Sequence, residues 1–288
     1  MSATVAPAVT TRIPPHAYFV VSAVFHYLGP AFAVLLFAHV APLGVAWLRI
    51  ASAAALFALW RRPWRYFGRC SGRERWIIAA LGLVLAVMNS VFYEAIARLP
   101  LGTVGAIEFL GPIGLAALGL RTARNFAALA AAAAGVYLLT DLRIAVEPLG
   151  LLFAFANCAL FVIYIVLGHQ IAADGGSTGI DRLAAAMLIA AVFAFPVGVA
   201  DARPAFTDPW LAGAAVGVGV SSSVIPYICD QLAMARLPRA TFALMLSLLP
   251  ATAALIGALV LHQVPSLLEA AAIGLVIVGV ALHRRDDA

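Results

Sequence analysis

Lysine is absent from this sequence of 288 residues, and charged residues of any kind make up only 11% of it. A soluble domain carries about 25% charged residues. Without lysine there is no Walker A motif, which argues against ATP-driven transport by this chain alone. The cysteines Cys70, Cys158 and Cys229 are widely spaced and form no CxxC pair, so neither a disulfide framework nor a zinc site is indicated. We therefore expect no metal and no cofactor.

Apolar residues dominate instead, at 64% of the chain, with a mean hydropathy of +1.03. This composition predicts an all-α integral membrane protein. A helix that crosses a bilayer needs about 20 mostly apolar residues. The segments that meet this requirement are 17–38, 43–60, 76–97, 101–120, 125–140, 149–170, 183–200, 210–234, 240–261 and 266–283.

The positions of the 18 arginines predict an orientation. With the N-terminus in the cytoplasm, 14 arginines fall on the cytoplasmic side and 3 (Arg98, Arg143 and Arg203) on the other. Cytoplasmic loops of membrane proteins carry the basic excess. We expect ten spans with both termini in the cytoplasm, and the basic charge indicates this orientation rather than nucleic-acid binding.

A repeat becomes visible when the sequence is shifted by about 138 residues, a spacing at which the run "ARLP" recurs. The run occupies 97–100 and again 235–238, and Pro112 then falls on Pro250. We predict two five-helix units, 1–142 and 143–288, with opposite orientations in the membrane. Inverted repeats are typical of secondary transporters, which bind substrate between the repeats. Duplication as a simple way to build a helix bundle is the alternative.

Two stretches carry a resemblance to a known family: "MNSVFYEAIARLPLGTVGAIEFLGP" (Met88–Pro112) and "ARLPRATFALMLSLLP" (Ala235–Pro250). They resemble the EamA group of the drug/metabolite transporter superfamily, and within it the bacterial amino-acid exporters of the threonine/homoserine and aromatic types. The resemblance implies export of a small-molecule substrate across the bacterial inner membrane, and an amino acid is the substrate that it favours. It also implies alternating access without ATP. Substrates vary among members of the group.

Two charged residues lie deep within predicted spans. Glu108 is eight residues from the outer end of its span, roughly 12 Å at the rise of an α-helix. Arg49 is at a similar depth in the second span. The pair can hold the ammonium and carboxylate groups of an amino acid, or Glu108 can carry a proton. The alternative is a buried ion pair that only joins helices. Glu108 aligns with Leu246 in the second unit, which favours the functional interpretation.

Prolines follow at matching positions in the two units. Pro112 cannot donate a hydrogen bond to the carbonyl of Glu108, and Pro250 cannot donate one to that of Leu246. We expect helix kinks there. Matched bends in two repeats are a pointer to a transport site, although an ordinary kink satisfied by a neighbouring helix is the alternative.

Weaker candidates are polar and aromatic side chains within spans, each of which can equally have a packing or interfacial role. Candidates for a cavity lining are Asn89, Tyr93, His26, Tyr27, Trp47, Asn157 and Tyr164, with Phe161 on the same face as the last two. Candidates for a gate are Asp230 and Glu94.

Enzyme function has one motif in its favour, the GxSxG match "GGSTG" at 175–179. It lies in a predicted loop between spans, without the strand–turn–helix context that the motif requires. An intramembrane hydrolase and a passive scaffold are therefore the alternatives from another class, and export of another metabolite or a drug is the alternative within the transporter class. The sequence fits proton coupling and facilitated diffusion equally and does not fix the oligomeric state.

Overall fold

The computed structural model describes residues 14–119, 122–144, 147–172, 176–234 and 248–282. Within these residues the regular elements are helices, and no strand occurs. The first half contains α2 (Pro15–Leu36), α3 (Pro42–Arg61), α4 (Pro63–Phe67), α5 (Gly72–Ile96), α6 (Leu101–Gly119) and α7 (Ala123–Ile144). The second half contains α8 (Pro148–Ala172), α9 (Gly176–Gly198), α10 (Arg203–Thr207), α11 (Pro209–Gly219), the π-helix η1 (Val220–Val224), α12 (Ile225–Met234), α14 (Leu248–Leu261) and α15 (Leu267–Leu282).

The all-helical prediction is confirmed, and each predicted span overlaps helical structure. The predicted span 210–234 is formed by α11, η1 and α12 in direct succession. The beginning of the predicted span 240–261, with Leu246, lies outside the described residues, as does the second "ARLP" run.

Local signals explain where several helices begin and end. Pro42 and Pro209 stand in the first turn of α3 and α11, where the N–H that proline lacks has no intrahelical partner anyway. Helix α5 begins with a capping box, in which Ser71 and Glu74 each bond to the other's backbone N–H. Helix α3 ends at Arg62, whose φ of 49° turns the chain directly into α4.

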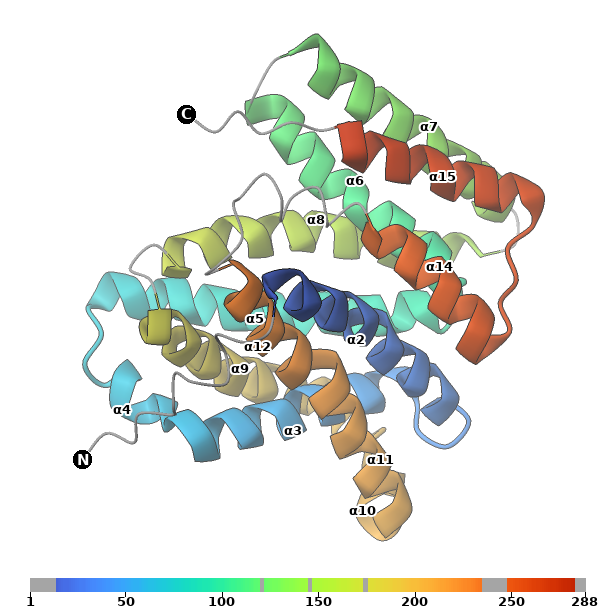
Figure 1. Cartoon of the computed structure of the whole chain (residues 1–288). Coiled ribbons are helices and arrows are strands. Elements are labelled where there is room, and N and C mark those ends of the chain that lie inside the picture. The colour runs from blue at the N-terminus through green and yellow to red at the C-terminus, as the bar shows by residue number, and fades with distance from the viewer. Residues whose placement is uncertain (1–13, 120–121, 145–146, 173–175, 235–247, 283–288) are drawn as a thin grey trace.

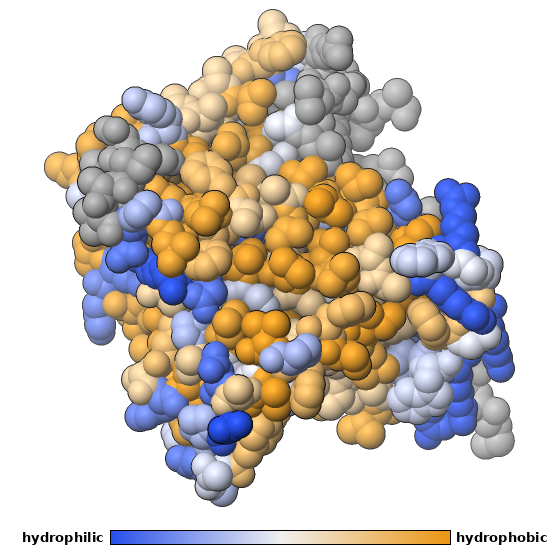
Figure 2. All heavy atoms as spheres, turned by 180° about the vertical axis from the view of Figure 1, so that it is seen from behind, coloured by the Kyte–Doolittle hydropathy of each residue, from blue (hydrophilic) through white to orange (hydrophobic). Residues whose placement is uncertain are grey.

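The helices have the length and composition of membrane spans. Six are long and apolar enough to cross a membrane: His16–Leu36, Pro42–Arg61, Gly72–Ile96, Pro148–Gly168, Gly179–Gly198 and Pro209–Cys229. Four more are apolar but shorter over the described residues: Leu101–Gly114, Ala123–Leu139, Leu249–Leu261 and Leu267–Leu282. Hydrophobic side chains cover most of the face in Figure 2, where lipid would satisfy them. The chain is therefore a multi-pass membrane protein.

Packing between helices joins the two halves of the chain. Helix α5 packs against α8 and α9, and α3 packs along α9. Helix α2 packs against α12 and α14, while α6 contacts α7, α8 and α14. Helices α7 and α15 form a closely packed pair at one end of the bundle, at the top of Figure 1.

Two separate hydrophobic cores result, and charged and polar residues lie where they meet. On α3, Val45 and Ala46 belong to one core and Ile50 belongs to the other. On α5, Met88 belongs to the second core and Phe92 to the first. Arg49 stands between Ala46 and Ile50 on α3, and Asn89 stands between Met88 and Phe92 on α5. Both polar side chains are buried. Buried polar side chains linked to Arg49 or close to Glu108 extend from this junction. We call this set the polar layer: Arg49, Asn89, Tyr27, Tyr93, Glu108, Asn157, Ser222 and Ser223.

Candidate functional site

Arg49 is held in the polar layer by three hydrogen bonds to uncharged groups. Its Nη1 donates to Asn89 Oδ1 at 2.5 Å, which joins α3 to α5. Its Nε donates to Ser223 Oγ and its Nη2 donates to the backbone oxygen of Ser222, both at 3.0 Å. Asn89 is itself fixed, because its Nδ2 donates to the Leu85 oxygen at 2.7 Å. The guanidinium is therefore rigidly placed, yet none of these acceptors neutralises its charge.

The π-helix η1 supplies two of the three acceptors. A single turn of π-helix widens the hydrogen-bond pattern, and such turns are frequent at functional sites. Here the turn contains Ser221, Ser222 and Ser223, all buried. Helix α2 lies directly against it, because a Cβ on Gly29 would stand 2.7 Å from the Ser222 backbone. These serines are not among the residues predicted from the sequence, although an uninterrupted "SSS" within an apolar span is a signal for them.

Glu108 enters the layer from α6 and is only partly satisfied. Its Oε1 accepts a hydrogen bond from Asn157 Nδ2 of α8 at 3.2 Å. Its Oε2 is buried and has no hydrogen-bond partner. The Tyr27 hydroxyl approaches the same carboxylate without hydrogen-bond geometry. Arg49 is near enough to attract the carboxylate electrostatically. In the part of the chain that the structure describes, however, the two side chains form no hydrogen bond or ion pair with each other.

Several buried polar atoms in this layer lack a partner. Buried polar groups in proteins are nearly always hydrogen-bonded, so each exception needs an explanation. The unpartnered atoms are Tyr27 Oη, Tyr93 Oη, Glu108 Oε2, Asn157 Oδ1 and Ser222 Oγ. They belong to five different side chains of the polar layer, together with a charged guanidinium and a carboxylate. The layer therefore has unused hydrogen-bonding capacity, contributed by both halves of the chain.

Aromatic rings surround the charged groups. The Arg49 guanidinium carbon lies 5.6 Å from the centre of the Tyr93 ring, within the range of a cation–π contact. His26 packs edge-on against Tyr27 with ring centres 5.1 Å apart. On α8, Tyr164 stacks on Phe161, which in turn contacts Phe109, the neighbour of Glu108. Tyr27 and Tyr93 thus belong to the polar layer and His26 contacts Tyr27, whereas Tyr164 packs against the second core and is connected to the layer only through Phe161 and Phe109.

Trp47 points elsewhere. Its Nε1 donates to the Ala191 oxygen of α9 at 3.1 Å, and its ring contacts Phe195 and Phe206. It joins α3 to α9 away from the polar layer. Glu94, a gate candidate, forms an ion pair with Arg98 one turn later. The side chain of Asp230, the other gate candidate, lies outside the described residues.

The predicted kinks concern α6 and α14. Helix α6 continues as a helix through Pro112, four residues beyond Glu108. Pro250 is the third residue of α14 as described. The kinks themselves stay predictions.

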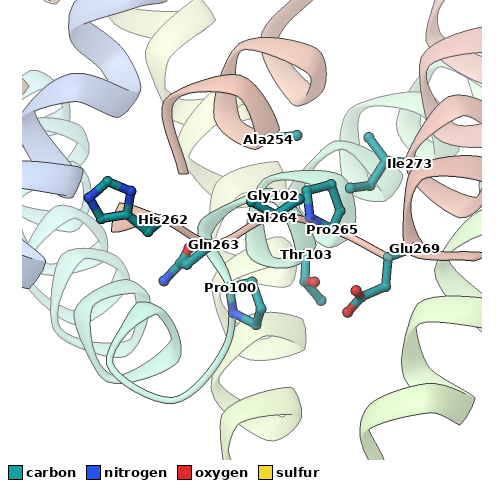
Figure 3. Close-up of a pocket in the computed structure, with 10 residues that line it drawn as sticks. All are labelled: Pro100, Gly102, Thr103, Ala254, His262, Gln263, Val264, Pro265, Glu269 and Ile273. Atoms are coloured by element: carbon teal, nitrogen blue, oxygen red, sulfur yellow. The ribbon is translucent and has the colours of Figure 1, made fainter. Parts of the chain in front are cut away.

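A second feature is a cavity of about 220 Å³ where α6 begins (Figure 3). Gln263, in the segment between α14 and α15, accepts a hydrogen bond from the Leu101 N–H at 2.9 Å through its Oε1. Thr103 and Glu269 line the same cavity. Sequence reasoning did not identify Gln263, because a polar residue in a connecting segment carries no signal of its own.

A helical membrane bundle with a buried, unpaired charged layer defines a class, the solute-handling membrane proteins. Comparison with known proteins specifies the family. The model of the EamA-like transporter family matches residues 148–284. The threonine/homoserine exporter RhtA of Salmonella typhimurium (strain LT2) is 31% identical over 238 residues, covering 82% of this chain and 79% of the relative. RhtA of Escherichia coli (strain K12) is 30% identical over 252 residues, covering 86% and 84%.

The chain belongs to the EamA-like transporter family. The resemblance predicted from the two quoted stretches is thereby confirmed, and the family makes the protein a membrane transporter rather than a hydrolase. A solved crystal structure, described only as that of a protein, has a TM-score of 0.62 and 18% identity to this chain. It covers 93% of this chain and 96% of its own length, and it supports the fold alone.

Proposed function

We propose that this protein exports amino acids, or closely related small metabolites, across the bacterial inner membrane by alternating access. The observation that carries the proposal is the arrangement of Arg49 and Glu108. They place opposite charges in one buried layer, are not bonded to each other, and keep unused hydrogen-bonding capacity. Charges are expensive within a membrane. A ligand that carries both charges would neutralise both residues at once.

The chemistry of each residue indicates which end of an amino acid it would bind. A guanidinium has five N–H groups and favours carboxylates. The three hydrogen bonds that Arg49 donates use only part of this capacity, and the rest can serve a substrate carboxylate. Glu108 Oε2 is a free acceptor beside the Tyr27 hydroxyl, which suits an ammonium group. Asn157 Oδ1 and Ser222 Oγ remain for other polar groups of the substrate.

The relatives favour amino acids over other zwitterions. The two RhtA proteins are described as exporters of threonine and homoserine. Export of another metabolite or a drug is the alternative within the class. Threonine and homoserine are therefore the first substrates to test.

Alternating access rests on an inverted repeat of units 1–142 and 143–288, which the packing of α7 against α15 supports. A Cβ on Gly279 would stand 2.7 Å from the Ala128 oxygen and 2.9 Å from Ala132 Cβ. A Cβ on Gly135 would likewise meet Ala272 and Val276. The contacting residues on the two helices are equivalent under one shift of about 144 residues: Ala128, Ala132 and Gly135 of α7 correspond to Ala272, Val276 and Gly279 of α15. This shift is close to the repeat period of about 138 residues. Reciprocal contacts of this kind are what a twofold relation produces.

The other helix contacts follow the same relation. Suppose that α2, α3, α5, α6 and α7 correspond to α8, α9, α11–α12, α14 and α15. Exchanging the halves then converts several of the contacts into others that also occur. The contact of α5 with α8 becomes that of α12 with α2, and the contact of α6 with α8 becomes that of α14 with α2. Helices α3, α6 and α7 each pack against their own counterparts. Rocking of the two units about the polar layer would expose it alternately to the two sides.

The orientation in the membrane, with both termini in the cytoplasm, is part of the proposal. Six arginines between α3 and the first turn of α5 stand at one end of the bundle: Arg61, Arg62, Arg65, Arg69, Arg73 and Arg75. Short cytoplasmic segments carry the basic excess in membrane proteins, which favours a cytoplasmic position for this end. The turn at Pro100 and the cavity beside it would then face outward.

The test is efflux of labelled threonine and homoserine from proteoliposomes, with and without a pH gradient. We expect efflux from the wild type, and its loss in Glu108→Gln and Arg49→Ala. Arg203→Gln, an exposed arginine at the far end of the bundle, is the control and should transport normally. Undiminished efflux in both site variants would remove the polar layer from the transport path. Absence of efflux for every amino acid in a wider panel would favour another metabolite.

A further inference from the structure

The segment from Trp60 to Trp76, which links α3 to α5, is built with two distinct faces. Its inward face comprises Pro63, which is buried, and Tyr66 and Phe67, which are half-buried. This face packs against α9 and the second hydrophobic core. We call the whole stretch, residues 60–76, the arginine segment.

Ionic and polar contacts fix the inward face. Arg61 Nε bonds to Asp181 Oδ1 at 2.7 Å. Arg182 of α9 donates to Glu74 Oε1 at 2.7 Å and to the Tyr66 hydroxyl at 2.8 Å. The segment is thereby tied to α9 at both of its ends, and the carboxylates of Asp181 and Glu74 are each bound to an arginine.

The turn is rigid as well. Arg75 reaches back and donates to the carbonyl oxygens of Phe67 and Gly68, at 3.2 and 3.1 Å, where α4 ends. These are carbonyls that a helix end leaves without intrahelical partners. A loop held in this way presents its outward side chains in a fixed arrangement.

The outward face carries uncompensated positive charge. Arg62, Arg65, Arg69 and Arg73 are all exposed. None of them forms an ion pair with any carboxylate that the structure describes. Figure 2 shows the molecule from behind, with hydrophilic side chains along its right-hand edge. This edge is the left-hand end of the molecule in Figure 1, where α4 lies.

Three tryptophans mark where this charge stands relative to lipid. Trp60, Trp64 and Trp76 are 50%, 56% and 78% exposed. Tryptophan is enriched at the level of lipid headgroups, because its ring is apolar and its N–H is polar. An exposed tryptophan beside exposed arginines is therefore expected at the headgroup layer rather than in bulk water.

We propose that the outward face of the arginine segment is a docking surface for anionic phospholipid headgroups. The four arginines supply charge and fork-shaped donors that match phosphate oxygens. The three tryptophans set the depth at which those phosphates stand. Because the same segment is bonded to α9, lipid bound there would also hold the first half of the chain against the second.

The test compares nanodiscs of phosphatidylcholine alone with nanodiscs that also contain phosphatidylglycerol. Native mass spectrometry would count the retained phosphatidylglycerol molecules, and thermal unfolding would report stabilisation. We expect phosphatidylglycerol to be retained by the wild type and to raise its unfolding temperature. A basic residue near an anionic surface contributes about 1 kcal/mol, so each arginine removed should weaken retention by roughly fivefold.

The variant for this test changes Arg62, Arg65, Arg69 and Arg73 together to Gln, with the four Arg→Lys changes as the charge-preserving partner. Arg203→Gln is the control for an exposed arginine at the other end. In phosphatidylcholine the Gln variant should unfold like the wild type, which separates lipid docking from folding. Retention that is equal in the Gln variant and the wild type would overturn the proposal, as would an equal loss in Arg203→Gln. A change in oligomer mass instead of lipid count would assign the surface to contacts between copies and would also overturn it.

Discussion

Arg49 and Glu108 lie in the same buried layer, but each is bonded to neutral partners rather than to the other. The arginine is bonded to Asn89 and to two serines of η1, and the glutamate is bonded to Asn157. A pair whose role was to join helices would gain most from direct contact, because an ion pair in low dielectric needs close geometry to offset its desolvation. Here the amide and hydroxyl partners hold each residue in place, and neither charge is neutralised by the bonds that hold it.

Removing the charge of Glu108 should abolish most transport. In Glu108→Gln the side chain keeps its size and can still accept from Asn157, so the fold is expected to survive. A hydrogen bond to a charged group contributes about 1.5–3 kcal/mol, so efflux should fall by about ten- to a hundredfold. The measurement is the initial efflux rate from proteoliposomes.

Glu94→Gln is the matched carboxylate control. Glu94 pairs with Arg98 near the end of α5, and such partly exposed pairs contribute only about 0–1 kcal/mol. Efflux of this variant should stay within about threefold of the wild type, a change that corresponds to less than that energy. Equal losses in the two variants would indicate a general sensitivity to charge rather than a site at Glu108.

The serines of η1 should differ in their importance although they are neighbours. Ser223→Ala removes the acceptor of Arg49 Nε and leaves a buried charged donor without its partner. Such a loss costs about 1–3 kcal/mol, so both the unfolding temperature and the apparent affinity for substrate should fall. Ser221 is the control, because its hydroxyl donates to the Gly217 oxygen of its own helix. If Ser221→Ala impaired transport as much as Ser223→Ala, the inference that Ser223 positions Arg49 for transport would be wrong.

The parts of the fold set by the bilayer could be predicted from the sequence. The length of apolar runs gave the helix positions, because hydrocarbon thickness fixes how many residues a span needs. The depth of Arg49 and Glu108 followed from the rise of a helix counted from the outer turns. Arg49 stands where the two cores meet on α3, whereas the neighbours of Glu108 on α6, Ile107 and Phe109, belong to the first core. The common depth of the two charges in a membrane stays a prediction.

The faces of the helices were harder to predict. Trp47 is two residues from Arg49, which on an α-helix is a rotation of about 200°. It therefore packs on α9 while Arg49 contacts η1. The serines of η1 were not predicted for a related reason. A π-helical turn rotates every residue that follows it to a different side of the helix, and the sequence periodicity does not show where such a turn lies.

Cys70, in the turn between α4 and α5, should ionise at higher pH than a free cysteine, because its pKa is raised. Burial raises the pKa of its thiol, and the nearby Glu74 carboxylate raises it further. A raised pKa means less thiolate at a given pH, and the thiolate is the form that reacts. Alkylation by iodoacetamide should therefore be slow at neutral pH and accelerate at higher pH than for free cysteine. The measurement uses a Cys158→Ala/Cys229→Ala background, so that Cys70 is the single thiol. A profile that matches free cysteine would contradict the buried environment.

Two glycines of α15 provide a test of the pairing with α7. A Cβ at Gly279 would stand 2.7 Å from the Ala128 oxygen, whereas a Cβ at Gly274 would meet nothing within 4 Å. Gly279→Ala should therefore force the helices apart and cost about 1–3 kcal/mol. Gly274→Ala should be neutral, or stabilising by roughly 0.5–1 kcal/mol, because alanine favours the helix.

Thermal unfolding of both variants in the same detergent measures the difference. If α7 and α15 are related by a twofold, Gly135→Ala should destabilise the protein about as much as Gly279→Ala, since Gly135 meets Ala272 in the reciprocal contact. A loss at Gly279 without a loss at Gly135 would show that the contact is one-sided. The inverted repeat would then lose its support from α7 and α15, and the recurrence of "ARLP" and the other exchanged helix contacts would remain in its favour.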